Sequence, residues 1–187
     1  MKIVRPNSDS LIVKDLTESQ IDSLIHILTS KSWNAEYDLP EYPIWNNWSD
    51  SIPLNVAGRY INKEVLREFK KTGVYKIFYK DETIYIGETR SVTRNGMLAR
   101  RSDFLSTIKG GDNIKNPYGN GTKFLENFSL DDIKYVSHRF HVVHPIYCKD
   151  AELEQLQMFY DENEKLPILQ TDWDYNRIVK SNLSSFY

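Results

Sequence analysis

Two short runs of β-branched and aromatic residues, separated by charged residues, are the clearest pattern in the chain. The first run extends from Gly73 to Tyr79 and the second from Thr83 to Gly87, with the charged triplet 80–82 between them. Such runs around a short polar break are typical of a β-hairpin. Because an isolated hairpin is only marginally stable in water, we expect further strands or a helix to cover it.

Helical patterns precede this hairpin. Residues 16–21 have the capping box and hydrophobic staple of a helix start, and we expect this helix to continue to about Lys31. Asn62 is a candidate N-cap for a second helix that ends near Lys71. The second helix has apolar positions for packing, and its outward positions are basic: Arg59, Lys63, Arg67, Lys70 and Lys71.

An aromatic segment lies between these two helices. It extends from Trp33 to Trp48 and includes Pro40 and Pro43. Prolines at this density exclude a continuous helix or an inner strand, so we expect an ordered arm. We favour packing of its aromatic side chains, because exposed tryptophans are costly without a use. If the chain binds DNA, this arm is where we would expect base contacts or stacking.

The chain after the hairpin alternates helical and strand patterns. A helix is predicted from Met97 to Ile108, followed by a glycine- and asparagine-rich loop over 109–121 and one or two helical turns over 122–128. Residues 135–143 have the alternation of a strand that suits a third member of the sheet. A last helix is predicted with Asp150 as its cap. The sequence therefore predicts an α/β fold, a small antiparallel β-sheet of about three strands flanked by helices, with an N-terminal helical and aromatic extension.

Composition restricts the class of protein. With 187 residues, the chain is long enough for one well-buried core. Its single cysteine, Cys148, cannot form a disulfide within the chain, and the first residues contain no apolar signal segment, so we expect a reducing, cytoplasmic setting. No apolar run approaches the roughly 20 residues of a membrane helix, so we expect no membrane partner.

The charge is distributed unevenly along the chain. The formal net charge is -2, but residues 59–109 contain 12 basic and 6 acidic side chains. This positive excess around the hairpin is the footprint expected where a phosphate backbone lies across the surface. Lysines and arginines that simply solvate exposed helices are the alternative.

Three histidines recur at every third position, as His138, His141 and His144. Strand alternation places His141 on the opposite face from the other two, and no cysteine or paired carboxylate lies at zinc-binding spacing. We therefore interpret these residues as ordinary strand histidines.

The hairpin contains two short tyrosine motifs, GVY at 73–75 and YIG at 85–87, separated by nine residues. This arrangement resembles the signature of the GIY-YIG nucleases. In that family the two tyrosines lie side by side on adjacent strands and form the floor of a site that cleaves nucleic-acid phosphodiesters. The resemblance covers about half of the chain and implies Tyr75 and Tyr85 as catalytic residues.

The family also has an arginine on the first helix after YIG, followed four residues later by a histidine or tyrosine. Arg100 fits that place, with the apolar Met97 three residues before it and Leu105 five residues after it. The residue four positions later is Phe104, which cannot accept or relay a proton. Rival arginines are Arg101, Arg94 and Arg90.

The resemblance further implies a glutamate that holds a divalent ion, on a helix followed by a proline and an asparagine. Glu152 is our candidate, because Leu156 and Phe159 lie on the same side of the helix and can seat that face. Glu154 points about 200° away and is the alternative. Either could be a first-turn glutamate favoured by the helix dipole. Gln170 stands where the family usually has asparagine.

The resemblance implies a Mg2+-dependent (or Mn2+-dependent) endonuclease that hydrolyses double-stranded DNA. Its roles would be Tyr75 as base, Tyr85 as positioning partner, Arg100 as charge stabiliser and Glu152 as metal ligand. Relatives of this size include type II restriction endonucleases, which work as homodimers or larger assemblies. A non-catalytic nucleic-acid-binding or protein-interaction module on the same fold stays open, as does RNA in place of DNA.

With this resemblance, three regions are expected along the chain. Residues 1–71 form the extension and a candidate DNA-recognition arm, residues 72–171 a GIY-YIG-like catalytic core, and residues 172–187 a C-terminal tail.

Overall fold

The structure, a computed structural model, describes the central and C-terminal parts of the chain: residues 2–3, 37–38, 43, 45, 47–91, 95–110 and 119–171. Near the N-terminus, β1 (Lys2–Ile3) pairs antiparallel with β2 (Tyr37–Asp38). The helix predicted over 16–31 and the tail after 171 lie outside the described residues. Within those residues, no helix is both long and apolar enough to cross a membrane.

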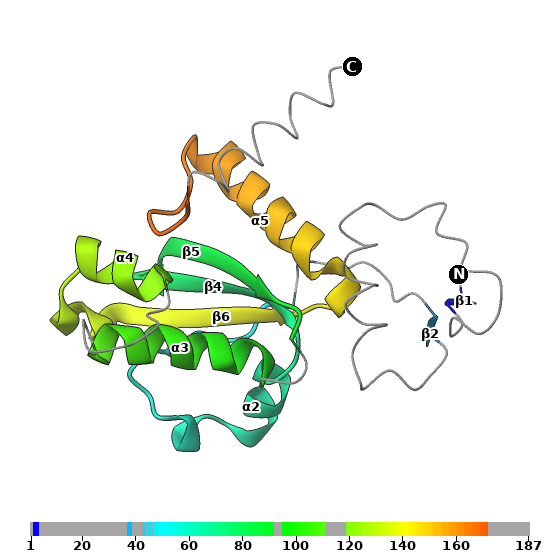
Figure 1. The fold of residues 1–187 in the computed structure, drawn as a ribbon, viewed down its shortest axis with the longest axis horizontal. Helices are drawn as coiled ribbons and strands as arrows, with labels where there is room; N and C mark the ends of the chain where they lie inside the picture. The colour runs from blue at the N-terminus through cyan, green and yellow to red at the C-terminus, as the bar shows by residue number, and fades with distance from the viewer. Residues whose placement is uncertain are drawn as a thin grey trace.

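The remaining strands form one antiparallel sheet in the order β3-β6-β4-β5 (Figure 1). They are β3 (Ile52–Pro53), β4 (Gly73–Tyr79), β5 (Glu82–Thr89) and β6 (Val136–Val142). The predicted α/β class with a small antiparallel sheet is confirmed. The sheet has four strands, because β3, from the segment before residue 72, pairs with β6.

The predicted hairpin is formed by β4 and β5. Its two turn residues, Lys80 and Asp81, both have positive φ, 48° and 69°. Two-residue turns of this kind match the right-handed twist of the flanking strands. Beyond Ile77 the register shifts, so Ile77 pairs with Tyr85 and the next pair skips Ile84. This bulge lets Ile84 and Tyr85 both contact the same hydrophobic core.

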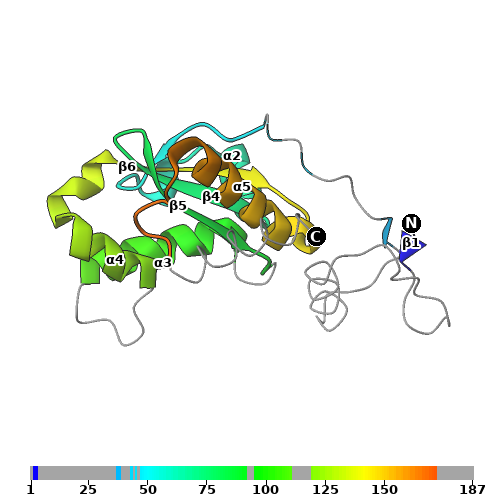
Figure 2. The ribbon, with the colours of Figure 1, turned by 90° about the horizontal axis from the view of Figure 1, so that it is seen from above.

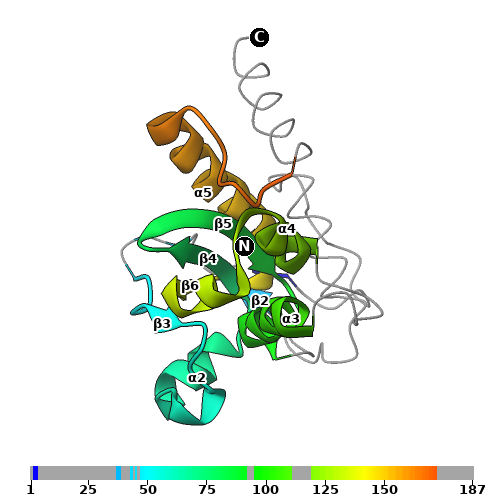
Figure 3. The same ribbon diagram turned by 90° about the vertical axis from the view of Figure 1, so that its left-hand side faces the viewer.

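Four helices flank the sheet: α2 (Lys63–Phe69), α3 (Gly96–Gly110), α4 (Gly119–Asn127) and α5 (Cys148–Asn163). Figure 2 shows α3 and α4 side by side along one side of the sheet, where the rings of Phe104 and Phe124 meet at 5.8 Å. Helix α5 covers the opposite face, and α2 lies at the periphery beside α3 (Figure 3). Short 3-10 helices complete the described chain: η1 (Gly58–Tyr60), η3 (Leu130–Tyr135) and η4 (Pro145–Tyr147).

Each face of the sheet has its own core, because side chains alternate along the strands. Tyr75 and Ile77 of β4 pack with α3 and α4, whereas Val74 of β4 and Ile86 of β5 pack with α5. His141 contacts tryptophans on the α5 side, whereas His138 contacts aromatic rings on the α3 side. The predicted alternation of these two histidines is therefore confirmed.

Two predicted boundaries were wrong. The loop predicted over 109–121 ends earlier, since α4 begins at Gly119. Gly121 allows this close packing, because a Cβ atom there would lie 2.7 Å from the Cβ atom of Thr107 on α3. The last helix begins at Cys148, directly after η4, so Asp150 lies in its first turn and is not its cap. An acidic side chain in the first turn still favours the helix dipole.

The described tryptophans of the aromatic arm pack onto the sheet, as predicted. Trp45 and Trp48 stack with ring centroids 5.9 Å apart, and the His141 ring lies 5.1 Å from Trp45. The Lys76 ammonium lies 4.7 Å from the centroid of the Trp48 ring. Both tryptophans cover the same core as α5. The remaining side chains of the arm, including that of Trp33, lie outside the described residues.

Candidate active site

The two signature tyrosines lie side by side on adjacent strands, as the sequence predicted. Tyr75 on β4 and Tyr85 on β5 have ring centroids 6.0 Å apart, with an angle of 48° between the ring planes. Tyr75 is almost fully buried, with 2% of its surface exposed, whereas Tyr85 is partly exposed. The pair therefore presents mainly Tyr85 to solvent.

Gly87 provides the space in which the two phenols meet. It pairs with Tyr75 in the strand register. A Cβ atom at Gly87 would lie 2.6 Å from Cε1 of Tyr85 and 2.9 Å from the hydroxyl oxygens of both tyrosines. The hydroxyls of Tyr75 and Tyr85 thus converge over this glycine, and any side chain there would displace them.

A buried histidine lies next to Tyr75. His138 on β6 has no exposed surface, and its ring centroid lies 6.5 Å from that of Tyr75 and 6.0 Å from that of Phe104. Among the described residues, neither ring nitrogen has a hydrogen-bond partner. Burial, followed by the nearby Arg101 guanidinium, lowers the pKa of His138 to about 3. The imidazole is therefore neutral at pH 7.

Arg100 lies on α3, in the layer that covers the tyrosine pair. It is partly exposed, and its Nη1 atom lies 3.7 Å from Oδ2 of Asp103. The apolar face of α3 packs against the same core as Tyr75, through Met97 and Phe104. The structure thus brings Arg100 and the two tyrosines onto the same side of the sheet, with the guanidinium able to reach solvent.

The rival Arg101 has a structural role. Its Nη2 atom donates hydrogen bonds to the backbone oxygens of Pro53 at 3.1 Å, Leu54 at 2.9 Å and Val56 at 2.6 Å. The residue is only 4% exposed, and burial lowers its pKa. Arg101 therefore fixes the turn after β3 to α3, and this role could not be inferred from local sequence, because the carbonyls belong to a distant segment.

The other rivals are placed differently. Nε of Arg90, at the end of β5, lies 3.3 Å from Oε1 of Glu88. Arg94 lies outside the described residues.

Glu152 lies on α5, in the layer on the opposite face of the sheet from the tyrosine pair. Burial raises the pKa of the Cys148 thiol, and the charges of Glu88 and Glu152 raise it further. Both carboxylates therefore lie close to that thiol. Glu88 directly follows the YIG motif and faces α5 because it alternates with Ile86. Sequence reasoning missed Glu88, although this alternation was the available signal.

The C-terminal segment covers the outer edge of β5, the strand that carries Gly87. The Leu169 amide donates to the Ile84 oxygen at 2.9 Å, and the Ile86 amide donates to Oε1 of Gln170 at 3.0 Å. Nζ of Lys123 on α4 donates to the Gln170 backbone oxygen at 2.6 Å. Gln170, at the place of the family asparagine, thus holds the strand one residue from Gly87.

The donor set fits a weakly held magnesium ion better than a dedicated metal cage. Within the described ranges, no group of three or more His, Cys, Asp or Glu side chains gathers at one point. Mg2+ is commonly bound by one or two carboxylates together with substrate phosphates and water. Glu152 and Glu88 supply carboxylates of this kind near the β5 end of the sheet.

Comparison with known proteins identifies no relative. No protein-family model, curated protein or solved structure matches the chain. The functional interpretation therefore depends on the geometry above and on the resemblance of the two tyrosine motifs.

Proposed function

We propose that the chain is a Mg2+-dependent endonuclease that hydrolyses DNA phosphodiester bonds. The observation that carries this proposal is the convergence of the Tyr75 and Tyr85 hydroxyls over Gly87 on two paired strands. The order of elements agrees with it, because a helix with Arg100 follows the hairpin and a helix with Glu152 follows β6. A sequence-specific restriction endonuclease is the form that we favour.

The proposed chemistry is in-line attack of water on the phosphorus atom. The reaction needs a group that accepts the proton of the water and a cation that stabilises the negative charge developing at phosphorus. Tyr75 accepts the proton, Tyr85 positions the reacting group through its hydroxyl, and Arg100 stabilises the developing charge. Because an ordinary phenol titrates near pH 10, the proton acceptor needs a nearby positive charge to act at neutral pH.

Glu152 would hold the divalent ion. When bound, a Mg2+ ion polarises the phosphoryl oxygens and supplies positive charge at the reacting centre. Glu152 lies in the α5 layer, whereas the tyrosines lie in the α3 layer, so the two sets can share one phosphate only at the edge of the sheet. β5 is the outermost strand and carries Gly87, so that edge is where the scissile phosphate is expected.

A non-catalytic DNA-binding module on the same fold is the second candidate. Two observations favour it. Tyr75 is almost fully buried, and Phe104 stands at the position where the family has a residue that can relay a proton. A protein with this arrangement could retain DNA without cleaving it.

Incubation with supercoiled plasmid and Mg2+ separates the two functions. The Tyr75→Phe variant is the test, and Tyr135→Phe is the matched control, since Tyr135 is exposed near the far end of the hairpin. We expect nicking by the wild type and by Tyr135→Phe, and none by Tyr75→Phe or in the presence of EDTA. DNA retention without nicking supports the binding module, and the absence of both activities contradicts both functions.

A further inference from the structure

The outer face of α2 is a basic surface. At 100° per residue, Lys63, Arg67 and Lys70 project within about 60° of one another around the helix axis. All three are exposed, whereas the apolar Phe69 on the other side of the helix is fully buried. The cationic side chains therefore follow one line along the exposed side of the helix.

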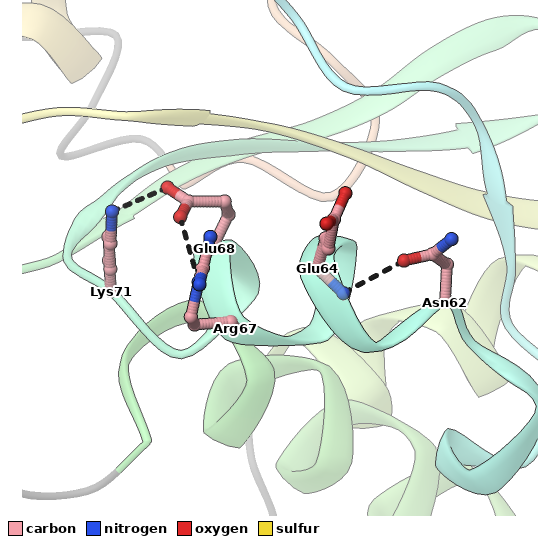
Figure 4. Close-up of polar contacts among 5 residues, drawn as sticks. All are labelled: Asn62, Glu64, Arg67, Glu68 and Lys71. Carbon is pink, nitrogen blue, oxygen red and sulfur yellow. Dashed lines mark hydrogen bonds and ion pairs between the residues drawn. The ribbon is translucent and has the colours of Figure 1, made fainter.

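The acidic residues of α2 lie on a separate flank, which Figure 4 shows. Glu68 binds Nζ of Lys71 at 2.6 Å and lies 3.6 Å from Nε of Arg67, and the hydrogen bond from Lys71 is the main cause that lowers the pKa of Glu68. In the part of the chain that the structure describes, neither Lys63 nor Lys70 forms an ion pair. These two ammonium groups are available to an anionic partner.

An exposed aromatic residue precedes this line of cations. Tyr60 in η1 is 72% exposed, and the Arg59 guanidinium lies 5.0 Å from the centroid of its ring. A single exposed aromatic residue is not unusual. Beside several cations, however, it offers the combination of stacking surface and positive charge that nucleic acids bind.

The basic surface leads toward the candidate active site. The Met97 amide at the start of α3 donates to the Lys71 oxygen at 3.1 Å. Gly96 adopts φ of +49° there, and a Cβ atom on it would lie 2.0 Å from the same oxygen. The end of α2 is thus fixed against the first turn of α3, and Arg100 lies one turn further along α3.

We infer that the outer face of α2, with Arg59 and Tyr60, binds the phosphate backbone of the DNA that the chain acts on; this inference rests on the proposed function. Lys63 and Lys70 are separated by about 10 Å along the helix axis. Successive phosphates of one strand advance by about 3.4 Å along duplex DNA, so the line spans about three phosphates. The surface lies outside the two tyrosine motifs and would anchor the duplex beside them.

Salt dependence of binding tests this surface directly. Binding of the full-length chain to a fluorescent 20-base-pair duplex is measured without divalent ions at several salt concentrations. The test variant is Lys63→Gln/Arg67→Gln/Lys70→Gln. The control Lys109→Gln/Lys134→Gln/Lys165→Gln removes the same charge from exposed lysines elsewhere. A Lys63→Arg/Lys70→Arg variant keeps the charge and checks that effects do not arise from damage to the helix.

Each phosphate contact contributes about 0.9 to the slope of log K against log salt. We expect the test variant to lose about 2.7 from the slope and about 500-fold in affinity at 0.1 M salt, whereas the arginine variant and the control change little. A test variant that keeps the wild-type slope, or a control that loses as much, overturns the inference. If the wild type still nicks plasmid in that case, the proposed function stands. A wild type that neither binds nor nicks DNA overturns both.

Discussion

Acidification should destabilise the fold through His138, a neutral imidazole sealed beside Tyr75 and Phe104. Its pKa in the folded chain is about 3, against an ordinary value of 6.5. The unfolded chain therefore takes up a proton first as the pH falls. The contribution to stability is complete above pH 6.5 and is lost progressively between pH 6.5 and pH 3.

The magnitude follows from the difference between these pKa values. Each pH unit in that window is worth about 1.4 kcal/mol, so about 2 kcal/mol is lost between pH 6.5 and pH 5. No acidic group compensates for protonation, since the charged group identified next to His138 is the Arg101 guanidinium. Protonation would place two positive charges together in the core, where their repulsion is only weakly screened.

Urea unfolding at pH 7 and pH 5 measures this effect, with His138→Leu as the reference because leucine has a similar volume and does not titrate. Other acid-sensitive groups are common to both proteins and cancel in the comparison. We expect the wild type to lose about 2 kcal/mol more than His138→Leu between the two pH values. Equal losses in the two proteins would refute the reasoning, as would an NMR titration of His138 with a pKa near 6.5 in the folded chain.

Further substitutions test the candidate site. Gly87→Ala should abolish nicking and reduce the free energy of unfolding by about 1–3 kcal/mol, measured by urea, because its Cβ atom would meet both hydroxyls. Arg101→Gln should cost about 3 kcal/mol by removing a buried network, whereas Arg100→Gln should abolish nicking with the melting temperature nearly unchanged. Gln170→Leu should cost about 1–3 kcal/mol by leaving the Ile86 amide unpaired, again measured by urea. Stable, active variants would contradict each assignment.

The hairpin could be predicted from sequence because its determinants are local. Alternation, a charged turn and two bracketing glycines all lie within a few residues of one another, and they fix both the strands and the pairing of Tyr75 with Tyr85. The cap of α2 was equally local, and Asn62 indeed accepts the Glu64 amide at 2.8 Å. The four described helices other than their boundaries followed from the same kind of pattern.

Features that depend on long-range contacts could not be predicted. The role of Arg101 is set by carbonyls about 47 residues earlier in the chain. The strand β3 is too short to have a pattern, and it forms because β6 offers an edge. Helical periodicity placed Glu152 on a particular side of α5, but periodicity does not reveal which face of a sheet a helix covers. The layer of Glu152 was therefore available only from the structure.

Single-turnover cleavage of a labelled DNA duplex by Tyr75→Phe and Tyr85→Phe, beside the wild type, tests the central claim most directly. Each variant removes one hydroxyl and keeps the aromatic ring, and DNA affinity and thermal stability are measured on the same preparations. We predict that the cleavage rate falls about 100-fold or more in both variants, while affinity stays within about twofold. Cleavage by both variants at the wild-type rate would contradict a catalytic role for the tyrosine pair.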